Sequence, residues 1–195
     1  MMDNGFFAMI SRMRYIDRWA LMRNEHGENL SEHSFDVAVI AHALAALRNE
    51  RFGGSVNGER AALLGLFHDA PETLTGDLPT PVKYYSDAVR DAYKTMEAQA
   101  CESLLEMLPA ALQAVYRPLL LPQPEDAELW SLVKAADKLS ALIKCLEERK
   151  AGNGEFVKAA EGVRAIIEGM DVPEAQVFLE EFLPAYELTL DELRG

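Results

Sequence analysis

Four residues that could bind a metal ion lie in segments whose neighbouring inward positions are apolar. His33 shares a helical stripe with Val37. A second apolar run ends in His68 and Asp69, and Asp137 lies in a third apolar run. Burying an unpaired carboxylate is costly, so an aspartate on an apolar face needs a cation or strong hydrogen-bond donors. Two imidazoles and two carboxylates can hold a divalent metal ion and leave positions open for water and substrate.

Each of these residues is weak evidence when it is taken alone. A single histidine on an apolar stripe is more often a hydrogen-bonded core residue than a metal ligand. His42 lies nine residues after His33, which at about 100° per residue places it on the opposite helix face, so we expect a structural role. His26 lies in a polar stretch, RNEHGEN, and is expected to be solvated. The prediction of a metal site rests on the combination of an inward histidine, a His-Asp pair and a later inward aspartate.

Hydrophobic periodicity predicts that helices carry these residues, and we find no convincing alternating strand. Asn29 and Glu32 form the pattern of a capping box at the start of the helix that contains His33. Pro71 must end or kink the helix that leads to His68, and residues 75–85 are expected to form a turn with two prolines. The expected helices span about residues 6–16, 30–49, 59–69, 86–107, 110–118, 129–150, 156–170 and 173–183. The predicted fold is an all-α, single-domain helical bundle over residues 1–195.

Composition limits the possible ligands and the cellular location. The 195 residues carry a net charge of −13, which argues against a nucleic-acid polymer as partner because such binding neutralises phosphates. A small phosphorylated ligand is still compatible, since Arg12, Arg14, Arg18 and Arg23 are concentrated in one short stretch. Neither a secretory signal nor a membrane-spanning run is evident, so we expect a cytoplasmic protein with no membrane association. Two isolated cysteines, 101 and 145, are expected to be reduced and partly buried.

The ordered set His33, His68-Asp69 and Asp137 resembles the H…HD…D pattern of the HD-domain superfamily of metal-dependent phosphohydrolases. The resemblance extends further, because RWALMR, NLSEHS, LFHDAPETLTGDLPTPVKY, LVKAAD and KCLEERKAGN are similar to blocks of the bacterial 5′-deoxynucleotidases of the YfbR type. These blocks reach from the N-terminus to about residue 153. The resemblance implies hydrolysis of 2′-deoxyribonucleoside 5′-monophosphates to a deoxynucleoside and inorganic phosphate, with a divalent metal as cofactor. It favours cobalt, with manganese or another transition metal as alternatives, and a homodimer.

The same resemblance assigns roles to individual residues. It implies that the metal ligands are His33, His68, Asp69 and Asp137, and that Glu72 and Arg18 are catalytic. It implies substrate contacts from Arg18, Trp19, His33, Asp69, Asp77, Leu78, Pro79, Thr80 and Asp137. From the residues alone, Glu72 could equally be a solvated acid in the first turn of a helix, Trp19 a core residue and Asp77 a turn residue.

Two other functions are compatible with the sequence. Another HD phosphohydrolase could act on a deoxynucleoside triphosphate, a cyclic dinucleotide or an alarmone, although a triphosphate would call for more basic residues around Arg18. A non-catalytic, acidic helical protein could bind partners through an amphipathic face, but it would not need the intact set of four ligands and Glu72. Metal analysis of the purified protein separates the enzymes from the binding protein.

Overall fold

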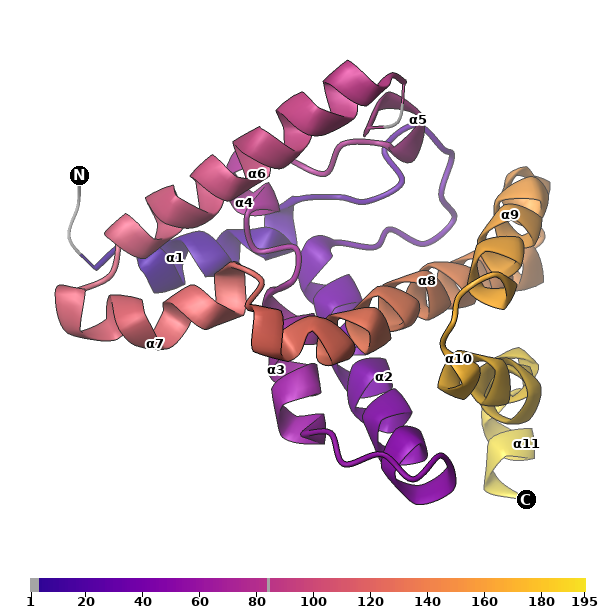
Figure 1. Cartoon of the computed structure of the whole chain (residues 1–195). Coiled ribbons are helices and arrows are strands. Elements are labelled where there is room, and N and C mark those ends of the chain that lie inside the picture. Colours follow the sequence, from indigo (N-terminus) through magenta and orange to yellow (C-terminus); the bar gives the residue numbers. More distant parts are fainter. Residues whose placement is uncertain (1–3, 84) are drawn as a thin grey trace.

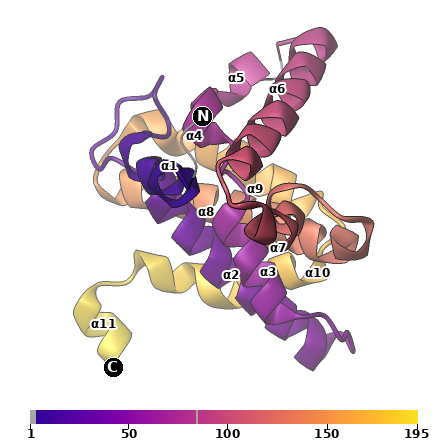
Figure 2. The same cartoon turned by 90° about the vertical axis from the view of Figure 1, so that its left-hand side faces the viewer.

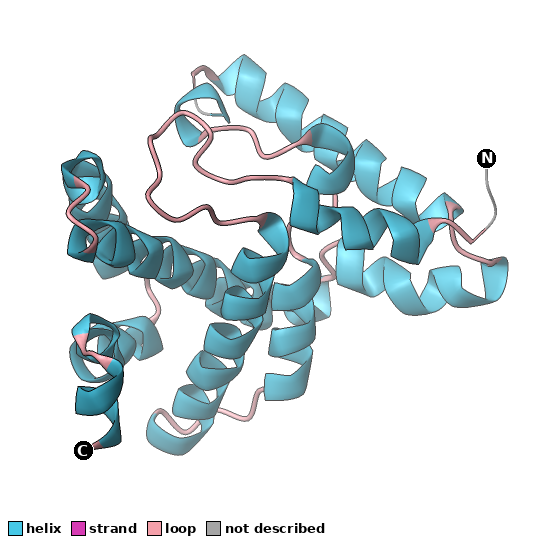
Figure 3. Cartoon of the chain, turned by 180° about the vertical axis from the view of Figure 1, so that it is seen from behind, coloured by secondary structure: helices cyan, strands magenta, loops and turns pink. Residues whose placement is uncertain are grey.

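The structure is a computed structural model that describes residues 4–83 and 85–195, so Tyr84 of the predicted proline turn lies outside the described residues. Helices dominate the described residues, which contain no strand beyond an isolated bridge between Asp17 and Asn29 (Figure 3). The predicted all-α fold is therefore confirmed. None of the described helices combines the length and the apolar content that crossing a membrane would require.

The helix that carries His33, α2 (Leu30–Arg51), begins as the sequence predicts. The Asn29 side chain accepts hydrogen bonds from the backbone amides of Ser31 and Glu32, at 2.9 and 3.1 Å. The Glu32 carboxylate in turn accepts a bond from the Asn29 amide at 3.1 Å. This reciprocal pattern confirms the capping box, which fixes the start of the helix one turn before His33.

A first set of helices packs around α2 (Figure 1). α3 (Gly58–Phe67) and α8 (Ala127–Lys150) both pack on it, and α9 (Val157–Glu168) and α10 (Pro173–Val177) pack against α8. Their buried residues form one continuous cluster, which we call the inner cluster. The chain ends in a π-helical turn (Phe178–Phe182), a 3-10 turn (Leu183–Glu187) and α11 (Leu190–Arg194), which stands away from the body in Figure 2.

A second group of helices forms the other side of the molecule. α1 (Phe6–Ile10) lies beside α6 (Asp87–Glu106), and α6 packs on α7 (Ala110–Leu120). The 3-10 helix η1 (Ser11–Tyr15) follows α1 and packs on α2. Buried side chains of α1, α6 and α7, among them Phe6 and Leu104, form a separate cluster together with Ala70 from the segment after α3, and we call it the outer cluster. Because Leu64 belongs to the inner cluster and Ala70 to the outer one, the His68-Asp69 pair lies where the two clusters meet.

The main differences from the predicted helices occur around prolines. The helix expected over residues 59–69 ends at Phe67, and the chain continues through a short α4 (Glu72–Thr75) that starts directly after Pro71. The expected proline turn contains one helical turn, α5 (Thr80–Lys83). α7 continues through Pro118 to Leu120, because the carbonyl that loses its amide partner belongs to Ala114, an exposed residue that water can reach.

Gly65 sets the spacing between α2 and α3. A Cβ atom at Gly65 would lie 3.0 Å from the Ala38 Cα, 3.1 Å from the Ala38 nitrogen and 3.2 Å from the Val37 carbonyl carbon, all backbone atoms of α2. We expect Gly65→Ala to push the helices apart and to lower the free energy of unfolding by about 1–3 kcal/mol, the usual cost of overpacking. Denaturant unfolding measures this loss. Gly162→Ala is the control, since a Cβ atom there meets nothing within 4 Å, and an equal loss in both variants would contradict the close packing.

Candidate metal centre and active site

Three helical segments bring the predicted metal ligands together. His33 lies on α2, His68 and Asp69 directly follow α3, and Asp137 lies on α8. The His33 Nε2 atom is 3.2 Å from Asp137 Oδ1 and 3.6 Å from Asp69 Oδ2, and the His68 Nε2 atom is 3.1 Å from the same Asp69 oxygen. Ligand atoms of His33, His68 and Asp69 all lie within 4.8 Å of one another. Asp137 joins this group through its contact with His33.

The hydrogen bonds of the two imidazoles leave one nitrogen of each ring available to a metal ion. The His68 Nδ1 atom is 2.7 Å from the Gly65 carbonyl oxygen, which only accepts, so Nδ1 carries a hydrogen and Nε2 is the ring nitrogen left for a metal ion. The His33 Nδ1 atom is 3.0 Å from the Ser140 hydroxyl, which fixes the ring. Both Nε2 atoms are buried without a hydrogen-bond partner among the described residues. Two orphaned imidazole nitrogens beside carboxylates fit a divalent metal ion.

The electrostatics of the site favour a cation. Burial alone would raise the pKa of Asp69, but His68, His33 and Arg18 outweigh it and hold that pKa below its usual value. Burial likewise opposes ionisation of Asp137, yet His33 and the adjacent Lys138 lower its pKa well below the usual value. Both carboxylates are therefore ionised at neutral pH and supply negative charge to the centre.

Glu72 is nearly completely buried, at 2% exposure, as the first residue of α4. Its Oε1 atom accepts a hydrogen bond from Lys83 Nζ at 2.8 Å, whereas Oε2 is buried and has no partner in the described part of the chain. Burial and, next, the charge of Asp69 raise the pKa of Glu72 to about 8, while Lys83 opposes the rise. Lys83 thus forms an ion pair with Glu72.

Arg18 and Trp19 are held beside the metal-site residues by Glu28, a buried acid on the same loop. The Arg18 Nη1 atom lies 3.4 Å from Asp69 Oδ2, and its Nε donates to Glu28 Oε2 at 3.1 Å. Trp19 donates from Nε1 to the same Glu28 oxygen at 2.9 Å and packs its ring against Phe156. The core packing considered for Trp19 is therefore present, and Arg18 faces the site as expected.

The predicted substrate segment follows α4 through Gly76. Gly76 has φ +74°, a left-handed conformation that glycine adopts without strain, and its amide closes the helix on the Glu72 carbonyl at 2.8 Å. Asp77 then lies within electrostatic range of Arg18 and Lys83, which oppose the rise that burial causes in its pKa. Leu78 and Pro79 are half-buried, and Thr80 is exposed at the start of α5. Substrate contacts by residues 77–80 stay a prediction.

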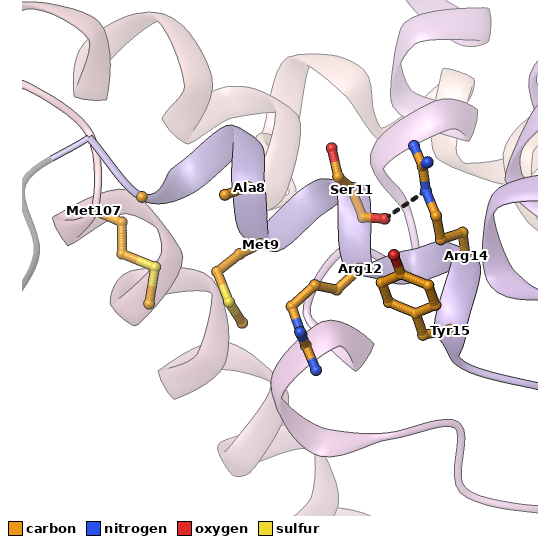
Figure 4. Close-up of a pocket in the computed structure, with 8 residues that line it drawn as sticks. Ala8, Met9, Ser11, Arg12, Arg14, Tyr15 and Met107 are labelled. Carbon is orange, nitrogen blue, oxygen red and sulfur yellow. Dashed lines mark hydrogen bonds between the residues drawn. The ribbon is translucent and has the colours of Figure 1, made fainter.

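The other three arginines of the basic stretch do not converge on the site. Arg12 and Arg14 line a surface groove beside α1 with Met9, Tyr15 and Met107 (Figure 4). Arg23 is exposed and pairs with Glu25 at 3.3 Å. Of the four, only Arg18 has a contact with a predicted metal ligand among the described residues. His42 and His26 are exposed, and His42 lies next to Gly58, away from His33.

Sequence reasoning missed two residues that orient the site. Ser140 lies three residues after Asp137 on α8 and contacts His33, and this spacing on one helix face was a usable signal. Glu28 lies in a polar loop segment without periodicity, so no sequence pattern distinguished it from a solvated acid. Its burial follows only from the folded conformation of the loop.

Two solved structures with a similar arrangement of helices are HD phosphohydrolases. An HD-domain phosphohydrolase from Listeria innocua has a TM-score of 0.79 and 26% identity, covering 93% of this chain and 87% of its own. An HD phosphohydrolase from cyanophage S-2L, solved with dA and one catalytic Zn²⁺ ion, has a TM-score of 0.64 and 18% identity, covering 93% and 96%. The fold and the arrangement of the site define an HD-domain phosphohydrolase.

Sequence comparison narrows the class. The family model described as 5′-deoxynucleotidase YfbR-like matches residues 5–186. The 5′-deoxynucleotidase YfbR of Escherichia coli is 49% identical over 193 residues, which cover 99% of this chain and 97% of the relative. The chain therefore belongs to the YfbR-like 5′-deoxynucleotidase family.

Proposed function

We propose that this protein is a metal-dependent 5′-deoxynucleotidase that hydrolyses 2′-deoxyribonucleoside 5′-monophosphates to a deoxynucleoside and inorganic phosphate. The observation that carries the proposal is the pair of buried, unpartnered Nε2 atoms of His33 and His68 beside the carboxylates of Asp69 and Asp137. The 49% identity to curated 5′-deoxynucleotidases supports the substrate class. One phosphohydrolase domain over residues 1–195 is part of the proposal.

His33, His68, Asp69 and Asp137 would hold the metal ion. When bound, the ion would polarise a phosphate oxygen and lower the pKa of a water molecule. Ser140 and the Gly65 carbonyl keep the two imidazole rings oriented, which limits the reorganisation needed on binding. Through this centre, His33, Asp69 and Asp137 would also contribute to the substrate contacts expected from the sequence.

Arg18 and Trp19 would position the two ends of the substrate. A guanidinium group binds phosphate with two parallel hydrogen bonds and stays charged at any working pH. Glu28 holds Arg18 by Nε alone, so the nitrogen that faces Asp69 can reach a phosphate. The half-buried Trp19 ring offers an apolar surface to the sugar, and Asp77 and residues 78–80 would complete the pocket, with Asp77 accepting from the 3′-hydroxyl.

Glu72 would transfer the proton that hydrolysis requires. Its Oε2 atom is the free carboxylate oxygen, because Lys83 occupies Oε1. Burial keeps the pKa of Glu72 near neutrality, at about 8, where a carboxyl group can both accept and donate a proton during turnover. The side chain can therefore serve the attacking water or the leaving 5′-oxygen.

The finer assignments rest on family resemblance and on particular surface features. Cobalt is proposed as the preferred metal, with manganese or another transition metal able to replace it. A homodimer is proposed because α11 exposes Leu190 and Leu193, at 64% and 56%. Cytoplasmic location is proposed from the two buried cysteines and the acidic composition. No nucleic-acid polymer or membrane partner is proposed.

A substrate panel tests the proposed function. Ribo- and deoxyribonucleoside 5′- and 3′-monophosphates are incubated with the protein and added cobalt, manganese or magnesium, and released phosphate is measured. We expect 2′-deoxyribonucleoside 5′-monophosphates to exceed their ribo counterparts by about 10–100-fold in kcat/KM, the range over which an apolar pocket rejects an extra hydroxyl. Equal rates on both sugars, or release of triphosphate from deoxynucleoside triphosphates instead, would contradict the proposal.

A further inference from the structure

The loop between η1 and α2 carries Arg18, Trp19 and Glu28, and its two ends are joined. The Arg18 amide donates to the Glu28 carbonyl at 2.9 Å, and the Leu30 amide donates to the Ile16 carbonyl at 3.0 Å. We call residues 17–29 the arginine loop. Loops closed in this way are held by their own contacts and by whatever binds their tips.

Trp19 shows that the arginine loop needs external support. Its φ is +59°, a left-handed conformation that is strained for a residue with a side chain. Such conformations persist only where the surrounding structure fixes them. The ring packs 5.3 Å from the Phe156 ring, centroid to centroid, so the strained residue is held against the inner cluster.

Glu148, completely buried near the end of α8, binds the tip of the arginine loop. Its carboxylate accepts hydrogen bonds from the backbone amides of Glu25 and His26, at 2.9 and 3.0 Å. The Lys144 ammonium donates to the same carboxylate and to the His26 carbonyl. These bonds outweigh the effect of burial and lower the pKa of Glu148 to about 2.

Asn153 completes this cluster. Its Nδ2 atom donates to Glu148 Oε2 at 2.8 Å and to the Arg23 carbonyl at 2.7 Å, while Oδ1 caps the next turn on the Glu155 amide. Lys144, Glu148 and Asn153 are the polar buried residues of the block KCLEERKAGN, to which the proposed chemistry gives no role. We call these three residues the loop clamp.

The loop clamp shares a helix face with the metal-site residues. Asp137, Ser140, Lys144 and Glu148 follow one another on α8 at spacings of three, four and four residues, which places them along one stripe. One end of this stripe orients His33 through Ser140, and the other end binds the arginine loop. The stripe thus fixes the loop relative to the metal site.

We propose that Lys144, Glu148 and Asn153 are positioning residues that hold the arginine loop so that Arg18 meets the phosphate and Trp19 meets the sugar. The proposal rests on the proposed function for its kinetic consequence. In the contacts described above, the loop clamp touches none of the four predicted metal ligands, and it does not touch Glu72. It therefore sets substrate affinity and sugar selectivity without setting the metal content.

Glu148→Gln tests the clamp, because glutamine keeps the size of the side chain but places an amide group against donors. We expect KM for a 2′-deoxyribonucleoside 5′-monophosphate to rise about tenfold, because hydrogen bonds to a charged group are stronger than those to a neutral one. We also expect a several-fold loss of deoxy over ribo selectivity and an unchanged metal content. Limited trypsin digestion after Arg23 reports on the loop directly. The Arg23 side chain is 73% exposed. Cleavage after Arg23 is expected to accelerate about tenfold when the loop clamp is broken.

Glu174→Gln is the matched control. Glu174 is a buried carboxylate on α10 that accepts two hydrogen bonds from Arg48, remote from the arginine loop. Both variants should lose stability, but only Glu148→Gln should change KM, selectivity and cleavage after Arg23. If Glu148→Gln fails to fold, Asn153→Ser, which keeps a capping oxygen, carries the same expectations.

Two outcomes would overturn the loop clamp. If Glu148→Gln has the same KM, sugar selectivity and cleavage rate as Glu174→Gln, the loop clamp has only a stabilising role. If Glu148→Gln also loses metal, the loop clamp acts on the metal centre itself. If the wild-type protein hydrolyses no deoxynucleoside monophosphate, the proposed function fails on its own. The trypsin comparison then still decides whether Glu148 holds the loop.

Discussion

Replacing Glu72 by glutamine is expected to lower kcat by at least about a hundredfold, the usual contribution of a positioned proton-transfer group. Glutamine has the same shape and can still accept the hydrogen bond that Lys83 donates to Oε1. It cannot exchange a proton at the position of Oε2, the buried oxygen without a partner. Metal content and nucleotide affinity should stay near wild-type values, because Glu72 is not among the proposed ligands.

Phosphate release under saturating substrate gives kcat, and calorimetric titration of nucleotide into the inactive variant gives its affinity. Glu174→Gln again serves as control, since it also replaces a buried acid by its amide but lies away from the site. Turnover of Glu72→Gln within a few-fold of the control would remove Glu72 from the reaction. A loss of metal in that variant would instead assign it to the centre.

Replacing His33 by glutamine is expected to have the largest effect on metal binding. His33 is fully buried, and its Nε2 atom lies between the carboxylates of Asp137 and Asp69, at 3.2 and 3.6 Å. Loss of groups that merely orient ligands weakens metal affinity by about 10–100-fold, so loss of a ligand should weaken it by roughly a hundredfold or more. Elemental analysis after dialysis measures the retained metal, and hydrolysis should fall in proportion.

The matched control is His42→Gln, because His42 is on the same helix but exposed on another face. It should retain metal and activity. Asp137→Asn is a second test of the centre, and its metal affinity should also fall. Full metal occupancy in both His33→Gln and Asp137→Asn would remove α2 and α8 from the centre and leave only the His68-Asp69 end of α3.

The inward-facing site residues could be predicted because regular helices relate sequence spacing to direction. His33 shares a stripe with apolar residues of α2, and Asp137 does so on α8, so periodicity predicts that both side chains point inward. The predicted helix end at Asp69 was less accurate, because α3 ends at Phe67 and His68 and Asp69 follow it. The order of motifs, not the helix boundaries, indicated the site.

The supporting residues could not be predicted because they depend on loop conformation. Glu28 and Glu148 are separated by 120 positions in the sequence, and both are buried only because the arginine loop folds back onto α8. No local sequence pattern predicts that the arginine loop folds back onto α8. The pairing of Lys83 with Glu72 likewise requires α5 to approach α4. Such contacts join irregular segments, in which side-chain direction does not follow a fixed period.

The proposed active-site residues are divided between the inner cluster and the outer cluster. His33 and Asp137 are on helices of the inner cluster, whereas Glu72 follows Ala70 of the outer cluster, and α4 and α5 pack on α6. A small tilt of α6 would therefore carry Glu72 and the segment after Gly76 outward while the helices of His33 and Asp137 stayed in place. Departure of the deoxynucleoside would then require no dismantling of the centre that the next turnover needs.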